Sequence, residues 1–351
     1  MISYYGSWWK NIPVFKPEMH PTPSMQITVI IPARNEAEHI SACLRSLLLQ
    51  SYPAELTQII VVNDHSSDNT AAIVQRFGYA GVQLLNLEEH VDRVINSYKK
   101  KAIEVAVSKA TGKLIVTSDA DCTFPTHWLQ TLAAFYVSQN AAFIAAPVRI
   151  RPAGSLLSIF QSLDFLTLQG ITGASVHQGF HAMCNGANMA YEKEAFYDVE
   201  GFKNIDAVAS GDDMLLMDKI RRQHPERIFY LKGPEVIVDS LPAAGWKAFL
   251  NQRIRWASKA DKYRDKKMLA VLLLVYLLNL LLLALLTAGF FNPFWLSCLL
   301  LLIVVKVLLE LPFIRAVAGF FRLQRLLIWF PLLQPLHIVY TVMAGFLGSF
   351  G

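Results

Sequence analysis

Short apolar runs alternate with amphipathic stretches over the first two thirds of the chain. Four runs rich in β-branched residues predict strands at 26–32, 58–62, 82–85 and 113–118. The stretches between them carry apolar residues at helical spacing, as in 35–50, 66–77 and 99–110. Asn35 is placed to cap the first of these helices. Uninterrupted apolar strands separated by helices are typical of a parallel sheet covered on both faces, so we expect an α/β domain over residues 25–240.

The pattern changes at residue 268, where apolar residues become almost continuous. Residues 268–291 contain no charge and are long enough to cross a hydrocarbon core of about 30 Å as a helix. Two further apolar stretches follow at about 294–313 and 326–348, so we expect three transmembrane helices in 268–351. Basic residues gather on one side of these spans: Lys259, Lys262, Arg264, Lys266, Lys267, Arg315, Arg322 and Arg325. By the positive-inside rule this places residues 1–267 in the cytoplasm and the chain in the inner cell membrane, as a multi-pass protein.

Two flanking segments have an interfacial character. In 241–267 a helical pattern brings Gln252, Arg255 and Trp256 within an arc of about 100°, with apolar residues on the other side. An amphipathic helix directly before a span is expected to lie at the membrane surface. The segment 1–24 contains the aromatic run SYYGSWWK, whose rings could rest among lipid headgroups or pack against the protein.

Charge narrows the choice of partners. The formal net charge is +5, and residues 268–351 contain four basic residues and one acidic residue, which leaves a surplus of only +2 elsewhere. So small a surplus argues against a nucleic-acid partner and suits a face beside anionic lipid. Within the apolar region Lys306 and Glu310 share one helix face and would tend to pair, and we expect their charges to snorkel toward the interface.

Polar clusters follow three of the predicted strands. They are ARNE at 33–36, NDHSSD at 63–68 and DAD at 119–121. Ligands of open parallel sheets bind at the carboxyl ends of the strands, so the three clusters should collect at one edge. In an extended chain Asp119 and Asp121 point to the same side, and carboxylates so close need a counter-charge. Mg²⁺ or Mn²⁺ bridging to phosphate oxygens would supply it, whereas a cap or turn is the alternative role.

Seven motifs resemble, in their order, those of the membrane-bound family 2 glycosyltransferases, which include cellulose, chitin and hyaluronan synthases and ceramide glucosyltransferases. Between Ile27 and Trp256 the chain contains VIIPARNE, VVNDHSSDNT, KKKAIEVA, DAD, CNGANMAYEKEAF, SGDDMLL and QRIRW. The last of them matches the Gln-x-x-Arg-Trp motif of this family in full. The resemblance implies the GT-A fold, a Rossmann-like nucleotide-diphospho-sugar transferase domain with a mostly parallel sheet.

The resemblance also implies a donor site, made of Ala33, Arg34, Glu36, Asp64, Lys99, Lys100, Asp119 and Asp121. Residues of the first cluster would line the nucleoside pocket, and Asp64 would hydrogen-bond the base or the ribose. Lys99 would lie near the nucleotide, with Lys100 as the alternative register. Asp121 would bind the metal ion, and Asp119, the second candidate metal ligand, would contact the ribose or the donor sugar.

A base and a leaving-group partner complete the implied site. Transfer with inversion needs a carboxylate that takes the proton of the acceptor hydroxyl, a role that maps to Asp213. Asp212 is the alternative register, or it caps the helix that we expect to start at Met214. Arg255 would face the pyrophosphate and Trp256 would stack on an acceptor, with Gln252 beside them. A plain juxtamembrane helix is the alternative role of this segment.

These motifs together predict an enzyme, an inverting, metal-dependent hexosyltransferase that uses a nucleotide sugar, with UDP the commonest nucleotide among such proteins. Three spans in one copy are too few for a sealed pore, so we favour single transfer onto a lipid, lipid-linked or glycan acceptor, with the catalytic domain in the cytoplasm. A processive polysaccharide synthase acting as a homo-oligomer is the first alternative. A membrane-anchored nucleotide-sugar-binding scaffold without activity is the second.

Overall fold

The computed structural model describes residues 1–351 apart from 18–23, 92–95, 209–210, 260–262, 264 and 350–351. The chain divides into two compact units. Unit 1 comprises residues 1–11, 150–181 and 242–351, and unit 2 comprises residues 12–149 and 182–241. Part of the segment 1–24 lies outside the described residues, as do Lys262 and Arg264, which contributed to the predicted orientation.

Unit 2 is built on a seven-stranded sheet in the order β3-β2-β1-β4-β7-β5-β8. The strands are β1 Ile27–Ala33, β2 Thr57–Asn63, β3 Val82–Asn86, β4 Leu114–Thr117, β5 Phe143–Ala145, β7 Met189–Glu192 and β8 Ile228–Tyr230. The pairs β1–β2, β1–β4, β2–β3 and β5–β8 are parallel, and only β7 runs antiparallel to its neighbours β4 and β5. The predicted α/β class with a mostly parallel sheet is therefore confirmed. A second, two-stranded sheet joins β6 Val148–Ile150 to β9 Val238–Ser240.

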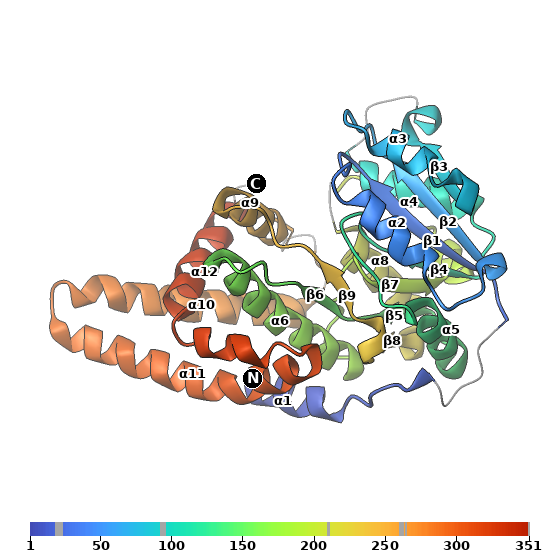
Figure 1. The fold of residues 1–351 in the computed structure, drawn as a ribbon. Helices are drawn as coiled ribbons and strands as arrows, with labels where there is room; N and C mark the ends of the chain where they lie inside the picture. Colours follow the sequence, from blue (N-terminus) through green and yellow to red (C-terminus); the bar gives the residue numbers. More distant parts are fainter. Residues whose placement is uncertain (18–23, 92–95, 209–210, 260–262, 264, 350–351) are drawn as a thin grey trace. The chain divides into compact units, whose positions relative to one another are not determined.

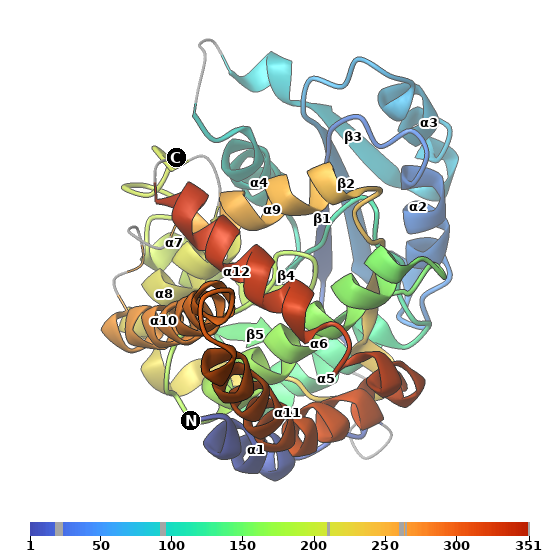
Figure 2. The ribbon, with the colours of Figure 1, turned by 90° about the vertical axis from the view of Figure 1, so that its left-hand side faces the viewer.

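Helices cover both faces of this sheet, with α2 and α3 on one side and α4 on the other (Figure 2). The helices of unit 2 are α2 Ile40–Leu48, α3 Thr70–Gln75, α4 Tyr98–Lys109, α5 Trp128–Gln139, α7 Lys193–Asp198 and α8 Asp212–Gln223. Short 3₁₀ turns connect them, namely η2 Ala54–Leu56, η3 Gly78–Ala80, η4 Leu87–His90, η5 Pro225–Arg227 and η6 Pro234–Val236. Because the central residues of β1, β2 and β4 are buried on both faces, they form continuous apolar runs rather than an alternating pattern.

Unit 1 is helical (Figure 1). It contains α1 Ile2–Asn11, α6 Leu156–His177, α9 Trp246–Ala257, α10 Lys266–Gly289, α11 Pro293–Phe321, the 3₁₀ segment η8 Gln324–Trp329, and α12 Gln334–Gly348. In α1 the side chains of Tyr5 and Trp9 are buried, and the Tyr5 hydroxyl lies 3.0 Å from Nε2 of His181, which follows α6. The aromatic run at the N-terminus therefore packs within unit 1 with these two rings. Helix α6 groups with this unit although it falls inside the predicted 25–240 domain.

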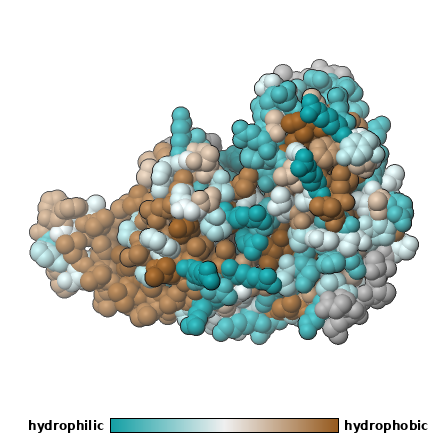
Figure 3. Space-filling view, in the orientation of Figure 1, coloured by the Kyte–Doolittle hydropathy of each residue, from teal (hydrophilic) through white to brown (hydrophobic). Residues whose placement is uncertain are grey.

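Two helices of unit 1, α10 and α11, are long and apolar enough to cross a membrane. Their outer surface is a continuous apolar area in Figure 3, and side chains such as Leu273, Leu300 and Leu308 are more than half exposed. A surface of this kind is not stable in water, so it indicates association with a membrane. The third predicted span differs from expectation, because 326–348 is divided between η8 and a helix of only 15 residues. A helix of that length extends about 22 Å, short of a hydrocarbon core.

The charges inside the apolar region are paired in the protein rather than directed outward. Lys306 is only 9% exposed, and its ammonium donates to Oε2 of Glu310 at 2.8 Å and to Oε1 of Gln334 in α12 at 2.7 Å. The expectation that this lysine snorkels is therefore wrong, because helix α12 supplies a second acceptor that the helix pattern alone does not reveal.

The core of unit 2 contains one close backbone approach that needs glycine. Gly112 precedes β4, and its N–H donates to Oγ1 of Thr28 in β1 at 2.9 Å. A Cβ at Gly112 would lie 2.4 Å from the Thr28 nitrogen and 2.6 Å from the carbonyl carbon of Ile27. No side-chain rotation relieves a clash with backbone, so β1 and β4 would have to separate.

We expect Gly112→Ala to lower the free energy of unfolding by about 1–3 kcal/mol or more, as overpacking does in other cores. Thermal unfolding of the full chain in detergent measures this effect. Gly78→Ala is the matched control, because a Cβ there meets nothing within 4 Å. Equal midpoints for the two variants would contradict the close packing of β1 on β4.

Candidate active site

The loops that follow β1 and β2 are tied together by backbone and side-chain hydrogen bonds. The N–H of Asp64 donates to the carbonyl of Ala33 at 2.8 Å. Asn35 has a positive φ of 56°, its N–H donates to Oγ of Ser66 at 3.0 Å, and its Oδ1 accepts from the N–H of Ser67 at 2.8 Å. The predicted cap at Asn35 is therefore wrong, because α2 begins only at Ile40 and Asn35 holds the neighbouring loop instead.

A second group of hydrogen bonds continues this connection toward α3. Oδ1 of Asp68 accepts from the N–H of Thr70 at 2.9 Å, and its Oδ2 accepts from the N–H of Ala37 at 3.1 Å. The Thr70 hydroxyl in turn accepts from the N–H of Glu36 at 2.8 Å. These bonds to Thr70 and Ala37 lower the pKa of Asp68. Asp68 thus has a structural role, since it helps to fix both loops in place. The carboxylates of Asp64 and Glu36 take no part in these hydrogen bonds.

Asp64 is buried at the end of β2 with polar neighbours from both loops. Its Oδ1 lies 2.9 Å from Nδ1 of His65, and its Oδ2 lies 3.9 Å from Nη1 of the exposed Arg34. The ring of His65 meets that of Tyr98 at the start of α4, edge to face, with centroids 5.0 Å apart. Ala33, Arg34 and Asp64 are thereby brought together, as the motif order predicts.

Negative charge accumulates where β4 ends. Burial and the carboxylate of Asp121 raise the pKa of Glu36 to about 7. Burial and the carboxylate of Asp119 likewise raise the pKa of Asp121. Within the described chain, Asp121 has no ion-pair partner, and its oxygens lie 3.5 Å from Sγ of Cys122 and from Oγ of Ser240. The two carboxylates are therefore placed where a cation would lower their energy.

Lys99 forms ion pairs with the carboxylates of Asp119 and Asp212. Its ammonium donates to Oδ1 of Asp119 at 2.7 Å and lies 3.3 Å from Oδ2 of Asp212. Burial alone would lower the pKa of Lys99, but Asp119 and Asp212 outweigh it and raise the pKa above its usual value. One lysine thus joins Asp119 of the DAD motif to Asp212 of the GDD motif, and these two residues are 93 positions apart in sequence.

Lys100, the alternative register, has a different role. Its side chain is 1% exposed, and its ammonium donates to the carbonyls of Ile205 and Val208 at 2.8 and 2.5 Å. It fastens the segment before the GDD motif to α4. The ion pairs with Asp119 and Asp212 are made by Lys99.

The GDD motif opens α8, with Gly211 as the N-cap residue in a left-handed conformation at φ 77°. Asp212 is buried against Lys99, and it forms no cap, so the predicted capping role is wrong: the helix starts at Asp212 itself. Asp213 is half-buried, and its oxygens accept from the N–H of Gly186 at 3.1 Å and of Met214 at 2.7 Å. Gly186 belongs to the NGAN segment, and its hydrogen bond to Asp213 is a contact that the sequence motifs did not predict.

The QRIRW residues belong to helix α9 in unit 1, and the structure shows a role for one of them that the Gln-x-x-Arg-Trp motif leaves open. Arg255 is exposed, and Gln252 and Trp256 are partly exposed. Arg253, to which sequence reasoning gave no role, is 4% exposed, and its guanidinium lies 4.2 Å from the centroid of the Trp256 ring. The predicted arc contained Gln252, Arg255 and Trp256 but not the buried Arg253. A hydrophobic pattern does not place an arginine on the buried face of a helix.

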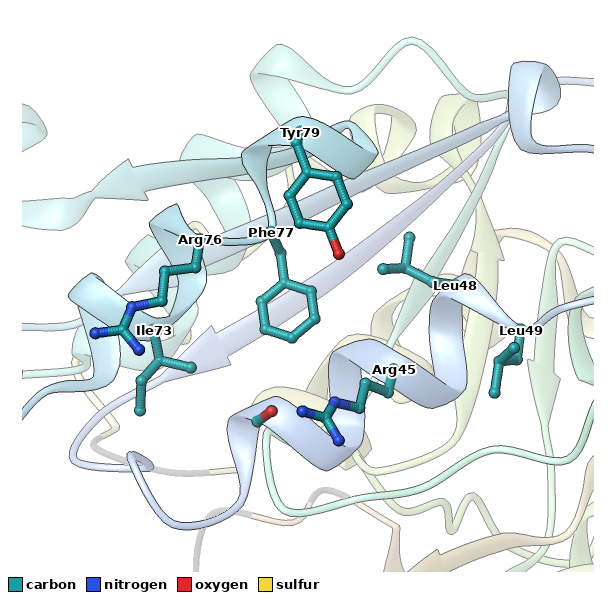
Figure 4. A pocket seen from close by; sticks show the side chains of 8 residues that line it. Arg45, Leu48, Leu49, Ile73, Arg76, Phe77 and Tyr79 are labelled. Carbon is teal, nitrogen blue, oxygen red and sulfur yellow. The ribbon is translucent and has the colours of Figure 1, made fainter.

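Unit 2 has a groove between α2 and the α3–η3 segment (Figure 4). Leu48, Leu49, Ile73, Phe77 and Tyr79 line it together with Ser41, Arg45 and Arg76. None of the carboxylates described above contributes to it. The groove is therefore a separate surface feature and not the predicted donor site.

Comparison with known proteins identifies the family. Residues 114–347, more than half of the chain, match "Glycosyl transferase family group 2", and residues 28–199 match "Glycosyl transferase family 2". The chain is a family 2 glycosyltransferase. It is 27% identical over 285 residues to the probable glycosyltransferase YdaM of Bacillus subtilis, covering 76% of this chain and 62% of that protein.

A second relative carries a polymer-synthase name. This glycosyltransferase is 26% identical over 242 residues to poly-beta-1,6-N-acetyl-D-glucosamine synthase of Staphylococcus epidermidis. The match covers 66% of this chain and 53% of that protein. The chain thus matches less than two thirds of the length of either relative. Its fold resembles that of the mannosyltransferase PcManGT from Pyrobaculum calidifontis, solved with GDP-Man and Mn²⁺, at a TM-score of 0.55 and 23% identity, covering 73% of this chain and 68% of that one. The sheet is accordingly that of a GT-A glycosyltransferase.

The residues of this glycosyltransferase fit a divalent ion held mainly by substrate. No group of three or more histidine, cysteine, aspartate or glutamate side chains forms a metal cage in the described part of the chain. Mg²⁺ and Mn²⁺ bound with nucleotides usually take only one or two carboxylates, with phosphate oxygens completing the shell. Asp121, which has a raised pKa and no cationic partner among the described side chains, suits that role, whereas Asp119 is already paired with Lys99.

Glu36 makes the stability of the metal-free glycosyltransferase depend on pH. Its pKa rises from 4.5 to about 7 on folding, so between these values the folded chain binds more protons than the unfolded chain. Stability that is present below pH 4.5 is therefore lost as the pH rises through 7. We expect Glu36→Gln to remove this loss and to be about 1 kcal/mol more stable than wild type at pH 8, after allowance for solvent screening, with no difference near pH 4.5.

Thermal unfolding in a chelating buffer at both pH values measures this difference. The control is Glu38→Gln, which removes an exposed carboxylate from the same segment. A Glu36→Gln variant that gains nothing at pH 8 would contradict the crowding of carboxylates at the end of β4.

Proposed function

We propose that the chain is an inverting, metal-dependent glycosyltransferase that moves a hexosyl group from a nucleotide-diphosphate sugar, a UDP-sugar in particular, to a lipid or lipid-linked acceptor. The observation that carries the proposal is the gathering of Asp119, Asp212 and Asp213 around Lys99 in unit 2. Chain segments from three separate motifs, KKKAIEVA, DAD and SGDDMLL, meet there. Support for the donor class comes from the family and from the GDP-Man and Mn²⁺ in the PcManGT structure.

In this proposal the two tied loops bind the nucleoside. Asp64 accepts a hydrogen bond from the base or the ribose, and Ala33, Arg34 and Glu36 line the same pocket. Asp119 contacts the ribose or the sugar, with Lys99 holding its carboxylate in place. A divalent ion bound by Asp121, with Asp119 as the neighbouring carboxylate, would neutralise the diphosphate charge.

Asp213 is the general base of the proposal. Its two hydrogen bonds from the N–H groups of Gly186 and Met214 hold the carboxylate at the N-terminus of α8, the positive end of the helix dipole. It accepts the proton of the acceptor hydroxyl as that oxygen attacks the anomeric carbon. Arg255, from α9, stabilises the departing diphosphate, with Gln252 and Trp256 beside it on the acceptor side.

A membrane acceptor follows from α10 and α11. Their exposed apolar surface associates the chain with a bilayer, so an acceptor that lies in the same plane is delivered by lateral diffusion. The proposal places the protein in the inner cell membrane as a multi-pass protein, with the catalytic unit in the cytoplasm, where nucleotide sugars are available. Basic residues before α10 support this orientation.

The proposal is tested with purified full-length protein in lipid vesicles, supplied with Mn²⁺ or Mg²⁺ and a panel of nucleotide sugars. Release of the nucleoside diphosphate identifies the donor. We expect release to require both a lipid extract as acceptor and the divalent ion, and to stop when a chelator is added. Acceptor-dependent release that persists in the chelator would contradict the role of Asp121.

Asp213→Asn separates an enzyme from a binding scaffold. The amide cannot accept the proton, so we expect transfer to fall by about 10²- to 10⁴-fold while donor affinity stays within about twofold. Initial rates and donor titration measure the two quantities. Asp206→Asn makes the same change at an exposed position and serves as control. Unchanged cellular function in the Asp213→Asn strain would favour the inactive scaffold.

A processive polysaccharide synthase is the second candidate, and a specific comparison favours it. A relative at 26% identity is named as a poly-beta-1,6-N-acetyl-D-glucosamine synthase. Two helices of spanning length in the described chain would not enclose a polymer, so this function requires several copies around one channel. Chromatography of the products from a labelled donor distinguishes the two reactions, because a ladder of chain lengths indicates a synthase and one added sugar indicates single transfer.

A further inference from the structure

A buried ion pair in unit 1 joins helix α6 to the motif helix α9. Nη2 of Arg253 in α9 lies 2.7 Å from Oδ2 of Asp164 in α6, and both side chains are 4% exposed. Asp164 belongs to none of the motifs found in the sequence. Two buried charges lose much hydration energy, and a pair of this kind adds little net stability compared with apolar residues of the same size. Its presence therefore calls for a role beyond holding two helices together.

The guanidinium of Arg253 is enclosed by aromatic rings. It lies 4.9 Å from the centroid of Phe249, one turn earlier, and 4.2 Å from that of Trp256, one turn later. Apart from the ion pair between Nη2 and Asp164, the guanidinium nitrogens of Arg253 have no hydrogen-bond partner within the described chain. The orientation of the cation is thus set by the carboxylate of Asp164 and by the two ring faces, whose attraction for a desolvated cation is considerable.

Asp164 is fixed in turn from helix α12. The hydroxyl of Tyr340 donates a short hydrogen bond to Oδ1 of Asp164, and Nε2 of His337 lies 3.9 Å from the same oxygen. Helices α9 and α12 lie side by side in both ribbon views (Figures 1 and 2). One carboxylate therefore connects α6, α9 and α12.

The inward position of Arg253 also determines the directions in which Trp256 and Arg255 point. At about 100° per residue, Trp256 lies about 60° from Arg253 around the helix axis, and Arg255 lies about 160° from it. The structure agrees, because Trp256 contacts the guanidinium and Arg255 is exposed. An arginine on the inside thus forces the motif arginine to the outside.

We propose that Asp164 is a positioning residue for the acceptor side of the site. It holds the Arg253 guanidinium beneath the ring of Trp256, and this stack fixes the ring plane and directs Arg255 outward. The inference rests on the proposed function, in which Trp256 and Arg255 act on the acceptor and the leaving group. Neither Asp164 nor Arg253 contacts a substrate in this account.

The first test is Asp164→Asn in full-length protein in lipid vesicles. The amide keeps the size of the side chain but removes the charge that orients Arg253. We expect kcat to fall about 100-fold, as displacements of about 1 Å do in other enzymes, with a raised KM for the lipid acceptor and a donor Kd within about twofold of wild type. Lys247→Met removes an exposed cation from the same helix and should leave all three values unchanged. An Asp164→Asn variant with wild-type acceptor kinetics would overturn the proposal.

A second variant distinguishes positioning from stability. The double substitution Asp164→Leu with Arg253→Met replaces the pair by apolar side chains, which other proteins tolerate without loss of stability. We expect its thermal midpoint to match or exceed that of wild type while acceptor kinetics stay as poor as in Asp164→Asn. Recovery of both stability and acceptor kinetics would show that the pair is only structural.

A spectroscopic readout keeps the inference separate from the proposed function. The emission of Trp256, obtained as wild type minus Trp256→Phe, should shift in Asp164→Asn and in the double variant but not in Lys247→Met. If wild type transfers no sugar to any acceptor, the proposed function fails and this spectrum alone decides on the positioning. If transfer occurs and the Trp256 spectrum is the same in all variants, the positioning role fails and the function stands.

Discussion

The mutual repulsion of carboxylates at the carboxyl end of the sheet is the constraint on which unit 2 depends. Glu36, Asp119, Asp121 and Asp212 come from three chain segments and meet in a partly buried space. Lys99 neutralises part of this charge by joining Asp119 to Asp212, and the remainder, on Asp121 and Glu36, appears as raised pKa values. The metal-free protein is thus held in a state that binding of a cation with an anionic diphosphate would relieve.

The surrounding structure keeps these groups from moving apart. The loop after β1 is tied to the loop after β2 by hydrogen bonds around Asn35 and Thr70, and Lys100 fastens α4 to the segment before α8. Parallel strands bring the loops to one edge, and the antiparallel β7 leads from the NGAN segment, whose Gly186 binds Asp213, into the sheet. Preorganisation of this kind lets charged groups act without reorganising during the reaction.

Unit 1 also contains buried charges that are stabilised by ion pairs. Two of its charged side chains, Lys306 and Arg253, are buried among apolar helices, where unpaired charge is costly, and each belongs to an ion pair supported by a further polar group. Lys306 has Glu310 and Gln334, and Arg253 has Asp164, which also accepts from Tyr340. In each case helix α12 provides a partner. Although α12 is short for a span, its polar face links an apolar helix to the helix that carries the QRIRW motif.

The sequence by itself determined strands β1 to β4, the family and the clustering of the acidic motifs, because apolar periodicity and motif order are local properties of the chain. It did not reveal the short strands β5, β7 and β8 of the same sheet. It did not determine the partners of individual side chains: Asn35 and Asp212 do not cap helices, and 326–348 does not form one long helix. Only the tertiary structure showed that Lys99 bridges two motifs and that Arg253 is buried against Asp164. An ion pair between residues 89 positions apart leaves no periodic signal, because its energy arises from desolvation and distance in the folded state.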